Sequence, residues 1–164
     1  MGTWKRVQEY ADHIPHPLES LHLRMEKATF ILILDATCVK VRGKQKWVHI
    51  AYDTGIGVVH YALDDAETKT AYATILNMLE RAGYQPLVVV SDGHWSIEAA
   101  IADWNIPQQR CITHILRSLQ RMLEVKREAS QGNLVLYSRM KGILKTKRID
   151  DLPERVKDRK STRL

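Results

Sequence analysis

Two aspartates, each at the end of a short apolar segment, are the residues of this chain with the clearest potential for chemistry. Asp35 follows the apolar residues 30–34, and Asp92 follows residues 87–91. A carboxylate at the end of a buried strand is costly unless hydrogen-bond donors, a cation or a metal ion compensate its charge. Two such segments that both end in aspartate predict one shared site.

The first of these segments is the element around which the chain is organised. Its apolar residues are continuous over positions 30–34, which predicts a strand covered on both faces. Side chains alternate along a strand, so Asp35 should share a face with Ile31, Ile33 and Thr37. The opposite face should carry Phe30, Leu32, Leu34 and Ala36.

Further short strands follow, separated by turns that contain glycine. Extended sequence continues to Arg42, residues 43–45 are a predicted turn, and strands are predicted at 46–53 and 58–63. Three successive strands with short connections predict an antiparallel meander. A helix capped by Asp64 should then run to Ala82. The residues expected in the core from this helix are Tyr72, Ile75, Leu76 and Leu79.

The second half of the chain alternates helices with short strands. A helix before the fourth strand requires a crossover, so this strand should be parallel to the first. We expect a strand at 87–91, a helix at 95–104, a strand at 108–112, a helix from Thr113, and a weaker helical segment at 134–144. Residues 131–133 should separate the last two helices.

This order of elements is that of the ribonuclease H-like fold, an α/β fold with a mixed sheet and flanking helices. Its first three strands form the antiparallel meander, and the fourth and fifth are parallel. The ends of the first and fourth strands lie side by side in that fold, so Asp35 and Asp92 would meet. Two divalent cations held by shared carboxylates activate a water or a 3′-hydroxyl for phosphoryl transfer. Hard oxygen ligands favour Mg²⁺ or Mn²⁺.

Three motifs in this chain are similar to those of a known family. They are Asp-Ala-Thr at 35–37, Ser-Asp-Gly-His at 91–94 and Gln-Arg-Cys-Ile-Thr-His at 109–114. Together they resemble the DDE transposases of the Mutator type, which include bacterial insertion-sequence transposases. The resemblance implies that Asp35 and Asp92 are catalytic metal ligands, the first two members of the Asp-Asp-Glu triad. It also implies that His94, Cys111 and His114 belong to the family signature.

We assign no third member of this triad. In the family it is a Glu that lies beyond a helical insertion, so the resemblance predicts a chain truncated before that residue. Glu124, Glu128 and Glu154 are candidates by type, but each is more easily interpreted as a surface helix residue. A site with two carboxylates would hold catalytic metals poorly, and we therefore expect a chain with an incomplete active site.

Charge is distributed unevenly along the chain, whose net charge is +6. Residues 1–109 carry 10 Lys and Arg against 13 Asp and Glu, whereas residues 110–164 carry 15 against 6. The basic end predicts contact with a polyanion, and DNA is the best candidate. Arg110, Arg117 and Arg121 would contact the DNA backbone, although ordinary solvent exposure explains them equally well.

Composition and length place these features in one globular core. We expect a linker at 1–27, a partial catalytic core at 28–128, and a basic helical extension at 129–164 that begins the insertion. No apolar run is long enough for a membrane span, and two cysteines form no disulfide framework. These features predict a soluble, cytoplasmic, DNA-associated protein of a prokaryotic cell, with homo-oligomers among its candidate partners.

Structural interpretations compete with the functional ones at several residues. Asp35 and Asp92 could cap a strand end or a turn, as Asp-Gly does often. His94 could cap the next helix as readily as contact a phosphate. Cys111 and His114 lack a second pair of zinc ligands, so a buried thiol beside a hydrogen-bonded histidine is favoured.

Two tryptophans are also candidates for contact with nucleic acid. Trp95 and Trp104 are predicted core residues rather than platforms for base stacking.

The predicted function is that of a transposase catalytic core, which cleaves DNA by hydrolysis and joins the freed 3′-hydroxyl to target DNA. The alternatives are an inactive remnant that binds DNA or a partner, and another ribonuclease H-like nuclease. Fold alone does not choose among them.

Overall fold

The computed structural model describes residues 15–125 and 129–145. The strands are β1 (Ile31–Val41), β2 (Lys44–Asp53), β3 (Gly57–Asp64), β4 (Val88–Ser91) and β5 (Gln108–Arg110). The helices are α2 (Leu21–Arg24), α3 (Lys69–Arg81), α4 (Trp95–Ala102), α5 (Ile112–Met122) and α6 (Gln131–Lys145), with a 3₁₀ turn at Met25–Lys27. The chain divides into two compact units, residues 1–110 and 111–164, and each is described by itself.

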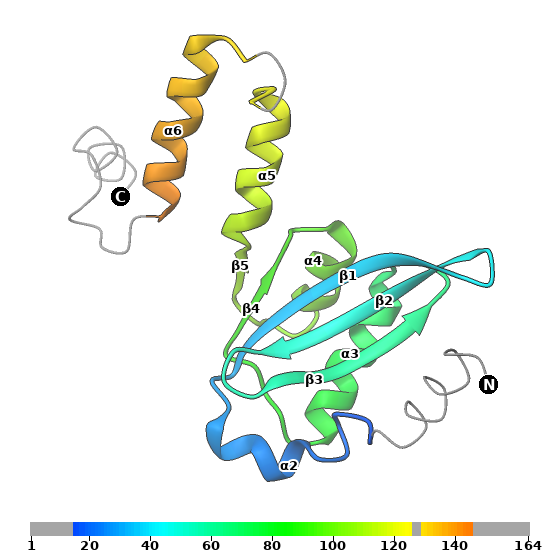
Figure 1. Ribbon diagram of the computed structural model, residues 1–164. Helices are drawn as coiled ribbons and strands as arrows, with labels where there is room; N and C mark the ends of the chain where they lie inside the picture. The colour runs from blue at the N-terminus through cyan, green and yellow to red at the C-terminus, as the bar shows by residue number, and fades with distance from the viewer. Residues whose placement is uncertain (1–14, 126–128, 146–164) are drawn as a thin grey trace, which may run out of the picture. The chain divides into compact units, whose positions relative to one another are not determined.

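The first unit holds a five-stranded sheet with the order β3-β2-β1-β4-β5 (Figure 1). The three strands β1, β2 and β3 are antiparallel neighbours, whereas β4 pairs parallel to both β1 and β5. Helix α3 connects β3 to β4, and α4 connects β4 to β5. This is the ribonuclease H-like arrangement, and the predicted mixed α/β sheet is confirmed.

The turn between β1 and β2 is tighter than the sequence suggested. Arg42 and Gly43 both have positive φ, at 51° and 78°, and β2 resumes at once with Lys44. Positive φ at both central residues is the geometry of a two-residue hairpin whose twist matches that of the strands. The predicted turn at 43–45 is therefore displaced towards β1.

Both long helices of the first unit pack on the same face of the sheet (Figure 1). That face carries Leu32 and Leu34 of β1, and the helix residues Tyr72, Ile75, Leu76 and Leu79 are buried against it as predicted. The opposite face is more open: Ile31 is 37% exposed, and Asp35 is exposed. Coverage of this strand on both faces was wrong, because α3 and α4 lie on one side only.

Helix α3 begins later than predicted. Thr68 is its N-cap, and the side-chain oxygen of Thr68 accepts a hydrogen bond from the Ala71 amide at 3.2 Å. Asp64, the predicted cap, is instead the last residue of β3, where its backbone pairs with Trp47 of β2. A threonine at the N-cap satisfies an amide that the first turn leaves without a partner.

The described part of the second unit consists of α5 and α6. Residues 131–133, the predicted interruption between the two helices, form the first turn of α6, and α5 ends earlier, at Met122. The side-chain amide of Asn133 donates to the Leu123 carbonyl at 3.3 Å and joins the two helices. None of the described helices is both long enough and apolar enough to span a membrane.

Candidate active site

The parallel pairing of β1 and β4 places the two candidate aspartates at equivalent positions. Ile33 pairs with Val90, and each aspartate lies two residues after this pair: Asp35 within β1, and Asp92 directly after the end of β4. Neighbouring strands in a sheet lie about 4.8 Å apart, so side chains at equivalent positions are neighbours. That the two aspartates would be neighbours was expected from the sequence, but Asp35 does not end its strand as predicted, because β1 continues to Val41 and pairs with β2 over that length.

Each aspartate uses one carboxylate oxygen in a local hydrogen bond. Oδ1 of Asp35 accepts from the Ala36 amide at 2.9 Å, and Oδ1 of Asp92 accepts from the His94 amide at 2.8 Å. Within the described residues, Oδ2 has no hydrogen-bond partner in either side chain. Asp92 thus makes the turn contact that the structural interpretation predicted, and the remaining oxygens fit a hard divalent cation. Over the same residues, no group of three or more His, Cys, Asp or Glu side chains is arranged to hold a metal ion.

A third carboxylate that the sequence reasoning did not select lies near this pair. Glu67, in the loop before α3, accepts a hydrogen bond from the hydroxyl of the buried Tyr72 at 2.8 Å. Burial, then the hydrogen bond and charge of Glu67, raise the pKa of Tyr72, and the charges of Asp92 and Asp35 add to the shift. All three carboxylates therefore act on one hydroxyl. The only signal for Glu67 along the sequence is its place three residues after Asp64, which is typical of a helix cap.

His94 lies between Glu67 and the start of α4. It occupies the N-cap position, but its side chain makes no cap hydrogen bond. Its ring nitrogen Nδ1 lies 2.7 Å from Oγ of Ser96 and 3.2 Å from Oε1 of Glu67. The expected alternative, that His94 caps α4, is confirmed for its position, because its carbonyl accepts from the Ile97 and Glu98 amides, but the ring takes no part in the cap.

Arg110 reaches across the turn that holds Asp92. Gly93 in that turn has φ of 84°, and a Cβ at this position would lie 2.7 Å from Nε of Arg110. The Arg110 guanidinium donates to Oε1 of Glu98 at 2.7 Å, and both side chains are partly exposed. Glycine at position 93 therefore permits both the positive φ and the close passage of the arginine side chain.

Trp95 does not belong to the core, contrary to prediction. It is 64% exposed at the start of α4, and its ring lies 6.0 Å from that of His94. Trp104, by contrast, is partly buried against the core as expected. The first turn of α4 buries Ser96 and Ile97, which leaves Trp95 on the outer side.

Cys111 and His114 belong to the second unit, at the start of α5. Cys111 is half-buried, and Nδ1 of His114 is buried with no hydrogen-bond partner in the part of the chain that the structure describes. The expectation of a buried thiol beside a hydrogen-bonded histidine is wrong on both points. The role of this pair as a family signature stays a prediction.

The remaining candidates are exposed. Arg117 and Arg121 lie one turn apart on α5, and the Arg121 side chain contacts Oγ of Ser118 at 3.3 Å. Glu124 is also exposed, but with φ of 51° it follows the end of α5 and is not helical, contrary to expectation. Glu128 and Glu154 lie outside the described residues.

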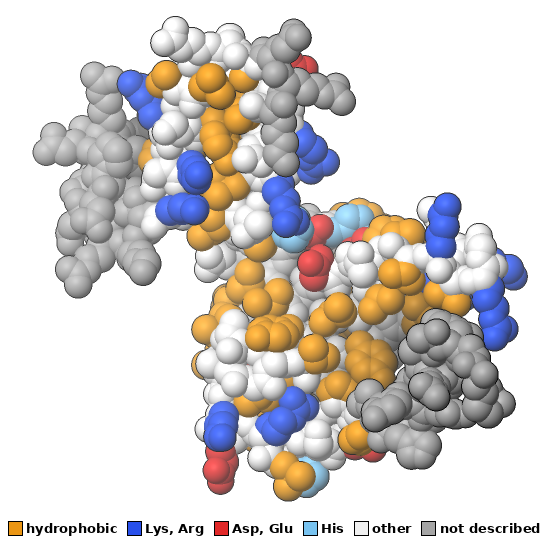
Figure 2. Space-filling view, in the orientation of Figure 1, with side chains coloured by type: hydrophobic (Ala, Val, Ile, Leu, Met, Phe, Trp, Pro, Cys, Tyr) orange, Lys and Arg blue, Asp and Glu red, His pale blue; other side chains and the backbone are white. Residues whose placement is uncertain are grey.

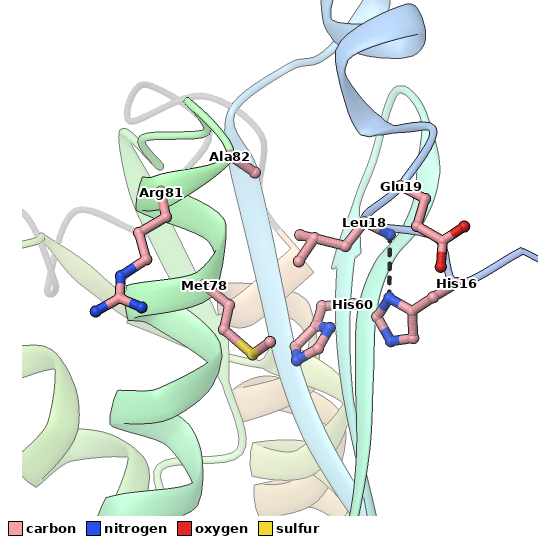
Figure 3. A pocket seen from close by; sticks show the side chains of 7 residues that line it. All are labelled: His16, Leu18, Glu19, His60, Met78, Arg81 and Ala82. Carbon is pink, nitrogen blue, oxygen red and sulfur yellow. Dashed lines mark hydrogen bonds between the residues drawn. The ribbon is translucent and has the colours of Figure 1, made fainter.

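An open pocket of about 540 Å³ lies at the opposite end of α3 from Glu67 (Figure 3). Its lining is mainly apolar, with two neighbouring histidines, His16 and His60, whose rings lie 4.7 Å apart. Burial, followed by the charge of His16, lowers the pKa of His60 to about 4. His60 is thus a neutral wall residue at neutral pH, and the pocket contains none of the carboxylates described above.

Comparison with known proteins identifies one family. The family model described as "Transposase, Mutator family" matches residues 6–160. None of the curated proteins matches the chain.

Several solved structures are similar in fold. The catalytic core domain of HTLV-2 integrase in complex with magnesium matches in its trimeric and dimeric forms. Each match has 18% identity and a TM-score of 0.42, and covers 58% of this chain and 70% of the integrase chain. The simian T-cell lymphotropic virus intasome in complex with the PP2A regulatory subunit B56 gamma matches at 18% identity and a TM-score of 0.41. That match covers 65% of this chain and 46% of the other. These values carry no argument about function.

Proposed function

The chain belongs to the Mutator family of transposases, and we propose that Asp35 and Asp92 hold a divalent cation for the cleavage and transfer of DNA strands. The observation that carries this proposal is the register of β1 and β4, because each aspartate lies two residues after the Ile33–Val90 pair. The free Oδ2 atoms support it further.

The chemistry assigns separate tasks to the carboxylates and the backbone. Asp35 and Asp92 would supply hard oxygen ligands to Mg²⁺ or Mn²⁺, which polarises a phosphate and lowers the pKa of a bound water or hydroxyl. The amides of Ala36 and His94 hold one oxygen of each carboxylate in place. Fewer rotamers are then open to each aspartate, so less side-chain entropy is lost on binding.

We also propose that DNA is the partner of the basic helices. Figure 2 shows Lys and Arg side chains beside a stripe of hydrophobic ones on the unit that contains α5 and α6. Charged side chains exposed on these two helices are Arg117, Arg121, Arg139, Lys141 and Lys145. Such side chains neutralise phosphates without reading sequence. Arg110 would contact DNA near Gly93. Homo-oligomers and a cytoplasmic location stay predictions.

Mn²⁺ binding tests the metal site directly. Electron paramagnetic resonance of free Mn²⁺ gives the affinity of the chain for the ion. Asp35→Ala and Asp92→Ala should each weaken that affinity by about tenfold or more, because each removes a charged ligand, and tenfold corresponds to about 1.4 kcal/mol. Asp65→Asn is the matched control, since Asp65 is an exposed carboxylate paired with Lys46. Unchanged Mn²⁺ affinity in both alanine variants would refute the site.

Cleavage and DNA binding separate a transposase core from an inactive remnant. An active site predicts Mn²⁺-dependent strand cleavage that either alanine variant abolishes. A remnant predicts no cleavage by any variant, with DNA affinity unchanged or raised when the two acids are removed. Mn²⁺ affinity that depends on both aspartates, without cleavage, would support the metal site but leave the reaction to further parts of the transposase.

A further inference from the structure

Glu67 is more enclosed than the two aspartates it accompanies. Its side chain is 11% exposed, whereas Asp35 and Asp92 are classed as exposed. Its Oε1 accepts a hydrogen bond from the Tyr72 hydroxyl, and Nδ1 of His94 lies 3.2 Å from the same oxygen. A carboxylate that contacts two such groups has little freedom to rotate. It can therefore hold the His94 ring in one orientation.

Tyr72 provides the rigid side of this arrangement. It is completely buried, and its ring packs edge-on against the buried His49 at 5.0 Å. Its raised pKa keeps the hydroxyl protonated, and the hydroxyl therefore remains a donor to Glu67. Glu67 is thereby connected to the core of the sheet, although it lies in a loop.

His94 provides the outer side. Its backbone amide is bonded to Asp92, and its ring Nδ1 lies near Glu67 and Ser96. An ionised carboxylate only accepts hydrogen bonds, so Oε1 of Glu67 at 3.2 Å favours a proton on Nδ1 over a lone pair there. Oγ of Ser96, 2.7 Å from Nδ1, can then accept from it. The other ring nitrogen, Nε2, has no partner among the described residues and would then be an acceptor. The partner of one ring nitrogen commonly sets the state of the other in this way.

We propose that Glu67 is a positioning residue, which acts through His94 to present Nε2 as a hydrogen-bond acceptor beside Asp92. The group it would accept from is a hydroxyl, either the attacking water or the 3′-hydroxyl of a DNA strand. This inference rests on the proposed metal site at Asp35 and Asp92. Glu67 is assigned no contact with metal or DNA.

The tautomer of His94 is the first measurement. Long-range ¹⁵N–¹H spectra of the ¹⁵N-histidine-labelled chain distinguish Nδ1–H from Nε2–H, and His94→Ala assigns the signal. The native chain should show Nδ1–H, and Glu67→Ala should shift the population towards Nε2–H. Glu67→Gln, which keeps the size of the side chain, should give a mixture if the alanine variant does not fold. Asp65→Asn, two residues away, should change nothing.

A native Nε2–H tautomer, or one that neither Glu67 variant alters, would overturn the proposal. This result does not depend on catalysis, so it separates failure of the positioning role from failure of the metal site, which Mn²⁺ affinity reports.

The second measurement is a double-mutant cycle on Mn²⁺-dependent cleavage. Glu67→Ala should lower kcat by about tenfold with little change in KM, a loss typical of residues that orient a catalytic group. The double variant Glu67→Ala/His94→Ala should cleave no more slowly than His94→Ala alone, because Glu67 acts through His94. Multiplied losses in the double variant would show that Glu67 acts independently and would overturn the proposal.

Discussion

Replacement of Asp53 by asparagine should lower the free energy of unfolding substantially. Asp53 is completely buried at the end of β2 and accepts hydrogen bonds through both carboxylate oxygens. Oδ2 accepts from the Phe30 amide at 2.8 Å and from the Tyr84 hydroxyl at 2.7 Å. The donors to Oδ1 are the amides of Thr29, Gly55 and Ile56 and the Thr29 hydroxyl. One side chain thus joins the residues before β1, the turn after β2 and the connection between α3 and β4.

The magnitude follows from which donors an asparagine can still satisfy. Its amide nitrogen would replace Oδ2 and meet the Phe30 amide donor to donor, whereas the Tyr84 hydroxyl can rotate and accept. A buried amide without a partner costs about 1–3 kcal/mol, and bonds to a neutral acceptor are weaker than bonds to a charged one by about 1 kcal/mol. We expect Asp53→Asn to lower the free energy of unfolding by about 3 kcal/mol. Phe30, whose φ is 57°, would also lose the bond that holds its unusual backbone.

Urea unfolding followed by tryptophan fluorescence and circular dichroism measures this free energy. Asp65→Asn is the control, because Asp65 is 84% exposed and its ion pair with Lys46 lies at the surface. Exposed pairs of this kind contribute about 0–1 kcal/mol. A loss below about 1 kcal/mol in Asp53→Asn, or an equal loss in the control, would refute the reasoning.

The same carboxylate gives the stability a dependence on pH. Burial alone raises the pKa of Asp53, but the hydrogen bonds from Tyr84, Thr29, Gly55 and Ile56 outweigh it and lower the pKa. A carboxyl group with a lowered folded pKa stabilises the fold above its unfolded pKa of about 3.9 and loses that contribution as pH falls through the folded pKa. The difference in stability between the native chain and Asp53→Asn should therefore shrink below about pH 4.

Two further predictions concern the site and the basic helices. Gly93→Ala should lower the free energy of unfolding by about 1–2 kcal/mol, because an L side chain is strained at φ of 84° and its Cβ would displace Arg110. If adding Arg110→Ala to this variant restored all of the lost stability, the backbone strain would be refuted. Arg117→Ala should weaken binding to duplex DNA and reduce the slope of log affinity against log salt by about 0.9, the value for one phosphate contact. Arg81→Ala, an exposed arginine at the end of α3, is the control, and equal slopes in the two variants would contradict the role of Arg117.

Much of the fold could be predicted from the sequence. The runs 30–34 and 87–91 are short and rich in Ile, Leu and Val, and this length and composition favour buried strands over helices. Glycine-containing turns and one helix between the third and fourth strands then allow few topologies. That Asp35 and Asp92 are neighbours follows from that topology, since β4 pairs parallel to β1, whereas the continuation of β1 past Asp35 to Val41 does not.

Local signals were less decisive where several residues compete for one role. Asp64, Asp65 and Thr68 are all good N-caps, and propensity does not rank them. The pairing of β2 and β3 decides the matter, because it keeps Asp64 in the sheet, where its carboxylate lies 3.3 Å from the buried His49. The helix therefore starts only after Thr68. Coverage of β1 depends likewise on where helices pack, which an apolar run does not specify.

The sequence by itself determined the order of strands and helices, the buried face of α3 and the neighbouring placement of two carboxylates, one within β1 and one directly after β4. Those features depend on periodicity and on chain connectivity, which are local or nearly so. Only the tertiary structure decided that Glu67 contacts His94, that Asp53 joins three segments, and that Trp95 is exposed. Each depends on how segments far apart in the sequence pack together, and no pattern along the chain specifies that packing.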